Sequence, residues 1–136
     1  MLACPTAMRV LGLMSGTSAD GIDAVLASFS GRPERPRWQL LHSLNVPYPA
    51  GLRDRLLAVG QGQSRPAAAL LDLAEAVTEA QAGAARACDP QGQAELVGCH
   101  GQTLWHRPPQ GSRRGASWQL LQGPLLAELL ATPVVF

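Results

Sequence analysis

Small, hydroxylated and acidic residues gather in the stretch Met14-Ser-Gly-Thr-Ser-Ala-Asp-Gly-Ile-Asp23. A loop that holds polyphosphate needs converging backbone N–H groups, small side chains that let the anion approach, and hydroxyls that donate further hydrogen bonds. Carboxylates repel phosphate, so Asp20 and Asp23 fit such a loop only if they hold a Mg²⁺ ion that also binds the phosphates. The stretch therefore predicts a nucleotide-phosphate site with the following residues: Gly16, Thr17, Ser18, Ala19, Asp20, Gly21, Ile22 and Asp23.

A plain hairpin is the simplest alternative for this stretch, because Asp-Gly is a strong turn signal and Asp20-Gly21 contains it. A turn alone requires neither Gly16 nor the consecutive hydroxyls of Thr17 and Ser18. The stretch lacks the Gly-Lys-Ser/Thr ending of a P-loop, and its spacing is not that of a dinucleotide fingerprint. The pattern thus favours a phosphate loop of another type.

A second group of polar residues lies in Gly98-Cys-His-Gly-Gln-Thr-Leu-Trp-His-Arg-Pro108. A short buried strand, Glu95–Cys99, is expected to lead His100, Gln102 and Thr103 into a turn at the end of the strand, where open α/β sheets present side chains to ligands. Imidazole, amide and hydroxyl groups together can bind the hydroxyl and carbonyl groups of a sugar. The alternative is that the histidines only stabilise the loop.

Two other chemistries would use the same residues. A Cys99–His100 nucleophile pair requires both side chains on one side, yet neighbours on an extended strand point to opposite faces. A zinc site built from Cys88, Cys99, His100 and His106 meets the same difficulty and lacks a closely spaced pair of soft ligands. Neither is favoured.

Apolar periodicity predicts the elements that position both groups. The first three strands should form an antiparallel meander, followed by helices and further strands. Alanine and leucine dominate the expected core, with Trp38, Trp105 and Trp118 as its bulky members. The expected strands are Met8–Met14, Gly21–Phe29, Arg37–Val46, Glu95–Cys99 and Ser117–Leu121, with a last one starting at Pro133–Phe136, and the expected helices are Pro49–Val59, Pro66–Cys88 and Gly123–Leu130.

Composition limits the classes of partner and compartment. The 136 residues carry a net charge of +1, which gives no field that would attract nucleic acid or an anionic membrane. Cys4, Cys88 and Cys99 are odd in number and lack a Cys-x-x-Cys spacing, so we expect no disulfide framework. No apolar run approaches the roughly 20 residues of a membrane span, and Met1–Val10 lacks the features of a secretory signal. A cytoplasmic protein without nucleic-acid or membrane partners is predicted.

Both motifs together resemble those of the anhydro-N-acetylmuramic acid kinases, a bacterial family with the two-lobed, actin-like (ribonuclease H-like) ATPase fold also found in hexokinase. Met14–Asp23 is similar to the family's first phosphate motif, and Gly98–Pro108 to a Gly-x-His-Gly-Gln-Thr-x-x-His segment beside the active cleft. The resemblance implies an α/β fold, with residues 1–136 forming part of the N-terminal lobe and the second lobe absent. It also implies ATP and Mg²⁺ as cofactors and a homodimer in the full-length form.

The implied reaction is ATP-dependent phosphorylation of 1,6-anhydro-N-acetylmuramic acid with hydrolytic opening of the anhydro ring, a step in cell-wall recycling. The family's catalytic base is an aspartate in an Asp-Phe-Arg-x-x-Asp segment that follows a strand ending in Pro-Val-Val plus one residue. Pro133–Phe136 ends at that place, so the resemblance puts the base beyond Phe136. The chain then looks truncated, and we expect it to expose an apolar face.

Two local departures leave other interpretations open. Trp118-Gln119-Leu120 resembles a family strand, but Leu121-Gln122 replaces the family's Gly-Asp or Gly-Asn pair. Leu130-Ala131-Thr132 replaces its Thr-Gly-Ile. A non-catalytic, nucleotide-binding actin-like remnant is therefore the main alternative, and a small hydrolase or metal protein is the third.

Overall fold

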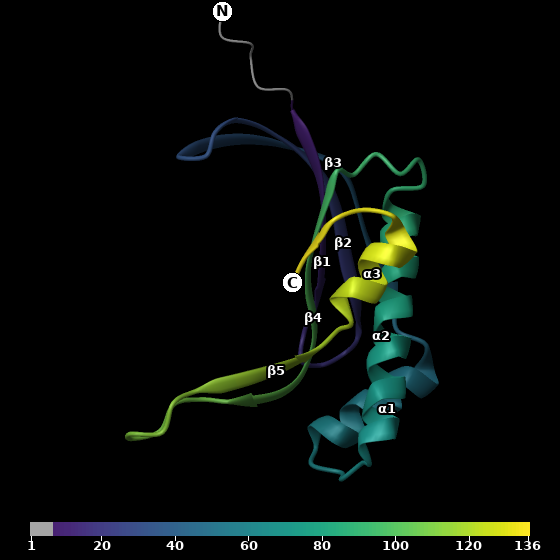
Figure 1. Cartoon of the computed structure of the whole chain (residues 1–136), viewed down its shortest axis with the longest axis vertical. Coiled ribbons are helices and arrows are strands. Elements are labelled where there is room, and N and C mark those ends of the chain that lie inside the picture. Colours follow the sequence, from purple (N-terminus) through teal and green to yellow (C-terminus); the bar gives the residue numbers. More distant parts are fainter. Residues whose placement is uncertain (1–6) are drawn as a thin grey trace, which may run out of the picture.

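The computed structural model describes residues 7–136, which form one mixed sheet of six strands with three helices (Figure 1). In chain order the elements are β1 (Met8–Ser15), β2 (Gly21–Arg32), β3 (Arg35–Pro47), α1 (Ala50–Gly60), α2 (Ala67–Cys88), β4 (Leu96–Arg107), β5 (Ala116–Leu120), α3 (Gly123–Leu130) and β6 (Val134–Val135). The predicted meander is confirmed, because β1 pairs antiparallel with β2 and β2 with β3. Cys4 lies outside the described residues.

The strand order β3-β2-β1-β4-β5, with β6 beside β4, places β1 and β4 next to each other in the middle of the sheet. These two strands run parallel, so the chain must cross over between them, and α1 and α2 make that crossover. The two motifs, far apart in sequence, thereby meet on neighbouring strands. The predicted α/β architecture is confirmed and is compatible with an actin-like ATPase lobe.

All three helices lie on one face of the sheet, where the core is formed (Figure 1). Leu11 and Leu13 of β1, Ile22 of β2 and Val97 of β4 point toward that side, and Val77 of α2 packs against them. Alternate residues of each strand therefore face the helices. None of the helices described between residues 7 and 136 is long and apolar enough to cross a membrane.

The opposite face of the sheet carries apolar side chains that no helix covers, and we call it the open face. It is defined by large residues that are 38–69% exposed: Met8, Met14, Val25, Phe29, Trp38 and Leu40. Strand pairing places Met8, Phe29 and Trp38 side by side across β1, β2 and β3. The expected exposure of an apolar face is confirmed.

The prediction that the tryptophans belong to the core is wrong. Trp38 is 69% exposed, and Trp105 and Trp118 are each 50% exposed. Trp38 lies on the edge strand β3, and the other two face each other across the β4–β5 hairpin. That hairpin extends away from the helices, so no helix described in residues 7–136 covers its outer half (Figure 1).

The prediction that a strand ends at Cys99 is also wrong, since β4 continues to Arg107. Gly101 does not end the strand but forms a β-bulge: Leu13 pairs with Cys99 and Ser15 pairs with Gln102, so β4 has one extra residue. Gly101 has a φ of +73°, and a Cβ there would lie 2.8 Å from the Leu120 carbonyl oxygen. Glycine is therefore needed both for conformation and for space.

Candidate functional site

The predicted phosphate loop connects β1 to β2 and runs from Gly16 to Asp20. Ala19 has a φ of +51° and is 1% exposed, and its N–H donates to the Gly16 carbonyl oxygen at 3.1 Å. Gly21 already belongs to β2 and pairs with Pro47. The alternative of a tight Asp20-Gly21 hairpin turn is therefore wrong, because the connection is five residues long and its left-handed residue is Ala19.

The outer part of this loop has the features that an anion requires. Within the described part of the chain, the backbone N–H groups of Thr17 and Ser18 donate to no protein acceptor. Both residues are exposed, and a Cβ at Gly16 would approach only the Ser18 hydroxyl, at 3.8 Å. Free donors next to open space can bind phosphate oxygens.

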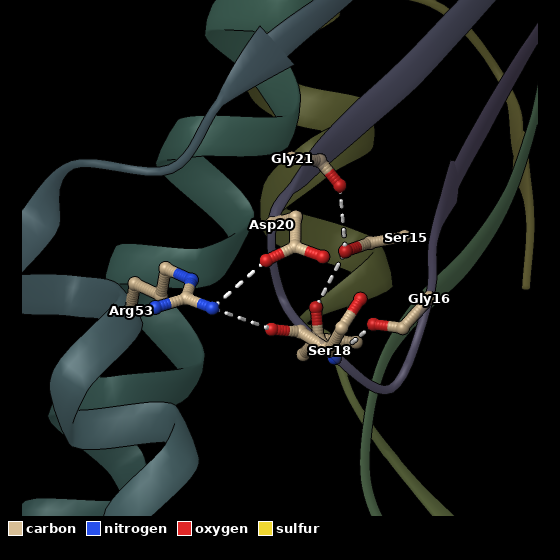
Figure 2. A network of polar contacts seen from close by, with 7 residues as sticks. Ser15, Gly16, Ser18, Asp20, Gly21 and Arg53 are labelled. Carbon is tan, nitrogen blue, oxygen red and sulfur yellow. Dashed lines mark hydrogen bonds and ion pairs between the residues drawn. The ribbon is translucent and has the colours of Figure 1, made fainter.

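Asp20 is bound by Arg53, which reaches the loop from α1 (Figure 2). The Arg53 Nη2 lies 2.8 Å from Asp20 Oδ1 and 3.5 Å from the Ser18 carbonyl oxygen. A hydrogen bond from the Ser18 side chain, together with the Arg53 guanidinium, holds the pKa of Asp20 below its usual range. The carboxylate is exposed and ionised at neutral pH, so it can accept hydrogen bonds from water bound to Mg²⁺.

Asp23 has different surroundings from Asp20. It lies on the open face of β2, where the Asn45 side-chain amide of β3 donates to Asp23 Oδ1 at 2.8 Å. Asp20 instead turns toward α1, so the two carboxylates have separate partners. Among residues 7–136 no three His, Cys, Asp or Glu side chains cluster as a metal site would require. The arrangement therefore fits a Mg²⁺ ion held by Asp20 better than one held by Asp20 and Asp23 together.

Gln102 supports the loop from the buried side. Its Nε2 donates to the Gly16 carbonyl oxygen at 2.9 Å and to the Thr103 carbonyl oxygen at 3.1 Å, and its Oε1 lies 2.6 Å from the Ser15 hydroxyl. Ser15 also lies 2.9 Å from the Gly21 carbonyl oxygen. The Gln102 side chain thus joins the loop's first residue to β4, and the bulge at Gly101 is what directs it there.

A cavity of about 400 Å³ lies between the loop, α1 and β4. Thr17 and Ala19 of the loop line it together with the segment from Gln102 to His106, and α1 and the residue after it close the other side. Its lining also includes Leu56, Leu57, Gly60 and Gln61. The structure therefore brings Gln102 and Thr103, but not His100, to a cavity shared with the phosphate loop.

His100 points away from this cavity. Cys99 is 3% exposed on the helix side, whereas His100 is exposed, which confirms that these neighbours point to opposite faces. Burial raises the pKa of the Cys99 and Cys88 thiols, which disfavours the thiolate that a nucleophile or zinc ligand needs. Both cysteines are free.

The two segments that differ from the family motifs, Leu121-Gln122 and Leu130-Ala131-Thr132, lie at the two ends of helix α3. The Gln122 N–H donates to the Thr78 hydroxyl at 3.0 Å just before the helix begins. Ala131 ends the helix with a φ of +48°. The replaced residues therefore lie directly before α3 and at its C-terminal end.

Sequence reasoning missed Arg53 and Trp105 as parts of this site. Arg53 lies 33 residues from Asp20 on an amphipathic helix, where an arginine normally indicates only a solvated face. Trp105 follows Thr103 closely and was expected in the core. Only the crossover of the chain, which brings α1 beside the loop, assembles these residues.

Comparisons with known proteins agree with the two motifs. The family model described as "Anhydro-N-acetylmuramic acid kinase" matches residues 8–136. The chain is 71% identical over 128 residues to the anhydro-N-acetylmuramic acid kinase of Parasynechococcus marenigrum (strain WH8102), and 65% identical over 128 residues to that of Synechococcus sp. (strain CC9902). Each comparison covers 94% of this chain and 34% of the relative, so the chain spans about a third of the length of the curated relatives that it matches.

Proposed function

Because the chain belongs to the anhydro-N-acetylmuramic acid kinase family, we propose that it is the nucleotide-phosphate-binding part of an ATP-dependent sugar kinase. The enzyme transfers the γ-phosphate of ATP to the 6-oxygen of 1,6-anhydro-N-acetylmuramic acid, while water opens the anhydro bridge at carbon 1. The product is N-acetylmuramic acid 6-phosphate, an intermediate of cell-wall recycling. The observation that carries this proposal is the loop Gly16–Asp20, whose free N–H groups border the cavity lined by Thr103.

Phosphoryl transfer depends on positioning and on neutralising charge, since the protein contributes little covalent chemistry. The N–H groups of Thr17 and Ser18 are available to bind phosphate oxygens, and their hydroxyls add donors. Mg²⁺, when bound, neutralises phosphate charge. In this chain the ionised Asp20 carboxylate would hold it through water, and Asp23 is the second candidate ligand.

The sugar occupies the cavity of about 400 Å³ beside the loop. Thr103 offers a hydroxyl and His106 an imidazole, while the half-exposed Trp105 ring offers an apolar face with a polar edge, a combination suited to a sugar ring. Gln102 fixes the distance between the loop and the segment of β4 that lines the cavity. His100 contacts the sugar only if the sugar or another segment reaches the open face. The resemblance puts the catalytic base and the second lobe outside residues 1–136, and a homodimer is proposed for the full-length form.

The test is an assay of the full-length kinase that contains this chain, with ATP and the anhydro sugar. Asp20→Asn should lower kcat/KM by about a hundredfold or more, because the carboxylate charge that would hold the magnesium ion through water is lost. Asp54→Asn removes an exposed carboxylate from α1 and serves as the control, with activity unchanged. Near-normal turnover by Asp20→Asn would remove the magnesium role.

A non-catalytic nucleotide-binding protein is distinguished in the same experiment. Titration calorimetry with Mg-ATP should show binding, and the assay should show sugar phosphorylation. Binding without turnover in the full-length protein would replace the kinase with that alternative.

A further inference from the structure

We propose that Arg53 is a positioning residue: by binding both neighbours of Ala19 it holds the loop Gly16–Asp20 in the conformation that accepts phosphate. The part of this inference that concerns turnover rests on the proposed function. The part that concerns the loop's conformation does not, and the two are tested separately below.

The loop needs an external support because of Ala19. Its φ of +51° lies in the left-handed region, which is unfavourable for a residue with a Cβ atom. Such a residue persists only where its surroundings determine its conformation. Within the loop itself, the Ala19 N–H donates to the Gly16 carbonyl oxygen at 3.1 Å, and the Ser18 side chain bonds to Asp20.

Arg53 supplies further contacts from outside the loop, in addition to the hydrogen bond from Gln102 to the Gly16 carbonyl oxygen. One guanidinium nitrogen approaches the Ser18 carbonyl oxygen and the Asp20 carboxylate, the residues directly before and after Ala19 (Figure 2). The Arg53 backbone is itself fixed, because it follows the buried Leu52 on α1 and its own N–H donates to the Pro49 carbonyl oxygen. The helix thus determines where Ser18 and Asp20 lie.

The exposure of this ion pair argues that its role is conformational. The Arg53 and Asp20 side chains are 39% and 69% exposed. Ion pairs this exposed contribute little to global stability because water and salt screen them. Their effect on a short loop is different, because a small free energy is enough to favour one conformation of five residues.

The first test measures the loop directly, by amide hydrogen exchange of the full chain. Arg53→Gln should accelerate exchange of the Ala19 N–H about tenfold, because the turn opens more often. Arg55→Gln, an exposed neighbour on the same helix, is the matched control and should leave that rate unchanged. Arg53→Lys retains the charge and should restore most of the protection. Unchanged exchange in Arg53→Gln, or equal acceleration in both glutamine variants, would overturn the proposal.

The second test separates positioning from a general loss of structure in the full-length kinase. Arg53→Gln should raise the KM for Mg-ATP about tenfold, with the KM for the sugar and the melting temperature nearly unchanged. In an Asp20→Asn background the same substitution should add little further loss, because the ionic attraction between the two side chains is already lost. A full additional loss would mean that Arg53 acts on phosphate itself. Absence of sugar phosphorylation in the unmutated kinase would sink the proposed function while leaving the exchange result valid.

Discussion

Ala131, the residue that ends α3, adopts a conformation that normally belongs to glycine. Its φ is +48°, its N–H donates to the Glu128 carbonyl oxygen, and its side chain is exposed. Ala131→Gly should therefore raise the free energy of unfolding by about 1 kcal/mol, because the left-handed strain disappears and no packing is lost. Urea denaturation measures the change.

Ala127→Gly is the matched control for this prediction. It lies inside α3, where glycine should lower stability by about 0.5–1 kcal/mol. If both glycine variants lost stability equally, the left-handed conformation of Ala131 would not be strained. Ala19, the other non-glycine residue with positive φ among residues 7–136, is a poorer test because its buried methyl group lines the cavity.

At the scale of elements, the bulge in β4 connects the second motif to the phosphate loop. Gly101→Ala should lower the free energy of unfolding by about 2–3 kcal/mol, because a Cβ meets the backbone of β5 and the φ of +73° becomes unfavourable. The same substitution should displace Gln102 and weaken Mg-ATP binding. Gly98→Ala, three residues earlier in β4, meets nothing within 4 Å and should leave both properties unchanged. Equal effects of the two variants on urea denaturation would contradict the role of the bulge.

Elements with strong periodicity could be predicted from the sequence, and those that depend on another strand could not. The helix expected at Pro66–Cys88 is observed at Ala67–Cys88, since its apolar stripe and the flanking Pro66 are local signals. Gly101, in contrast, was interpreted as the end of a strand. Whether a glycine ends a strand or forms a bulge depends on its partners, here Leu13 and Ser15 of β1, which the local sequence does not reveal.

In the candidate site, too, some residues could be predicted from local sequence and others depend on the fold. The small and hydroxylated residues of the loop are recognisable in sequence because phosphate binding needs those types at adjacent positions. Arg53 was not recognisable, since it reaches Asp20 only through the position of α1 in the fold. Gln102 was expected to contact substrate, and its amide instead makes hydrogen bonds to the loop. Its direct contact with a sugar stays a prediction.

For the whole molecule, the two faces of the sheet differ in what covers them. The helix side contains the core, while the open face carries Met8, Phe29 and Trp38 in a row across three strands. The tryptophans were placed in the core because large aromatic residues are usually buried. That expectation fails where the described helices lie on one side of the sheet and a hairpin extends away from them, as Figure 1 shows.

The open face should make the 136-residue chain associate at high concentration. Trp38 is 69% exposed on the edge strand β3, and exposed apolar patches next to an unpaired strand edge promote contact between copies. Trp38→Lys should reduce both the concentration-dependent increase in sedimentation coefficient and the binding of a hydrophobic dye. Leu71→Lys removes a residue that is 53% exposed on α2 and should change neither. If the chain stays monomeric and does not bind the dye, these side chains are too far apart to act as one apolar patch. If the two lysine variants reduce association equally, the added charge and not the loss of Trp38 is the cause.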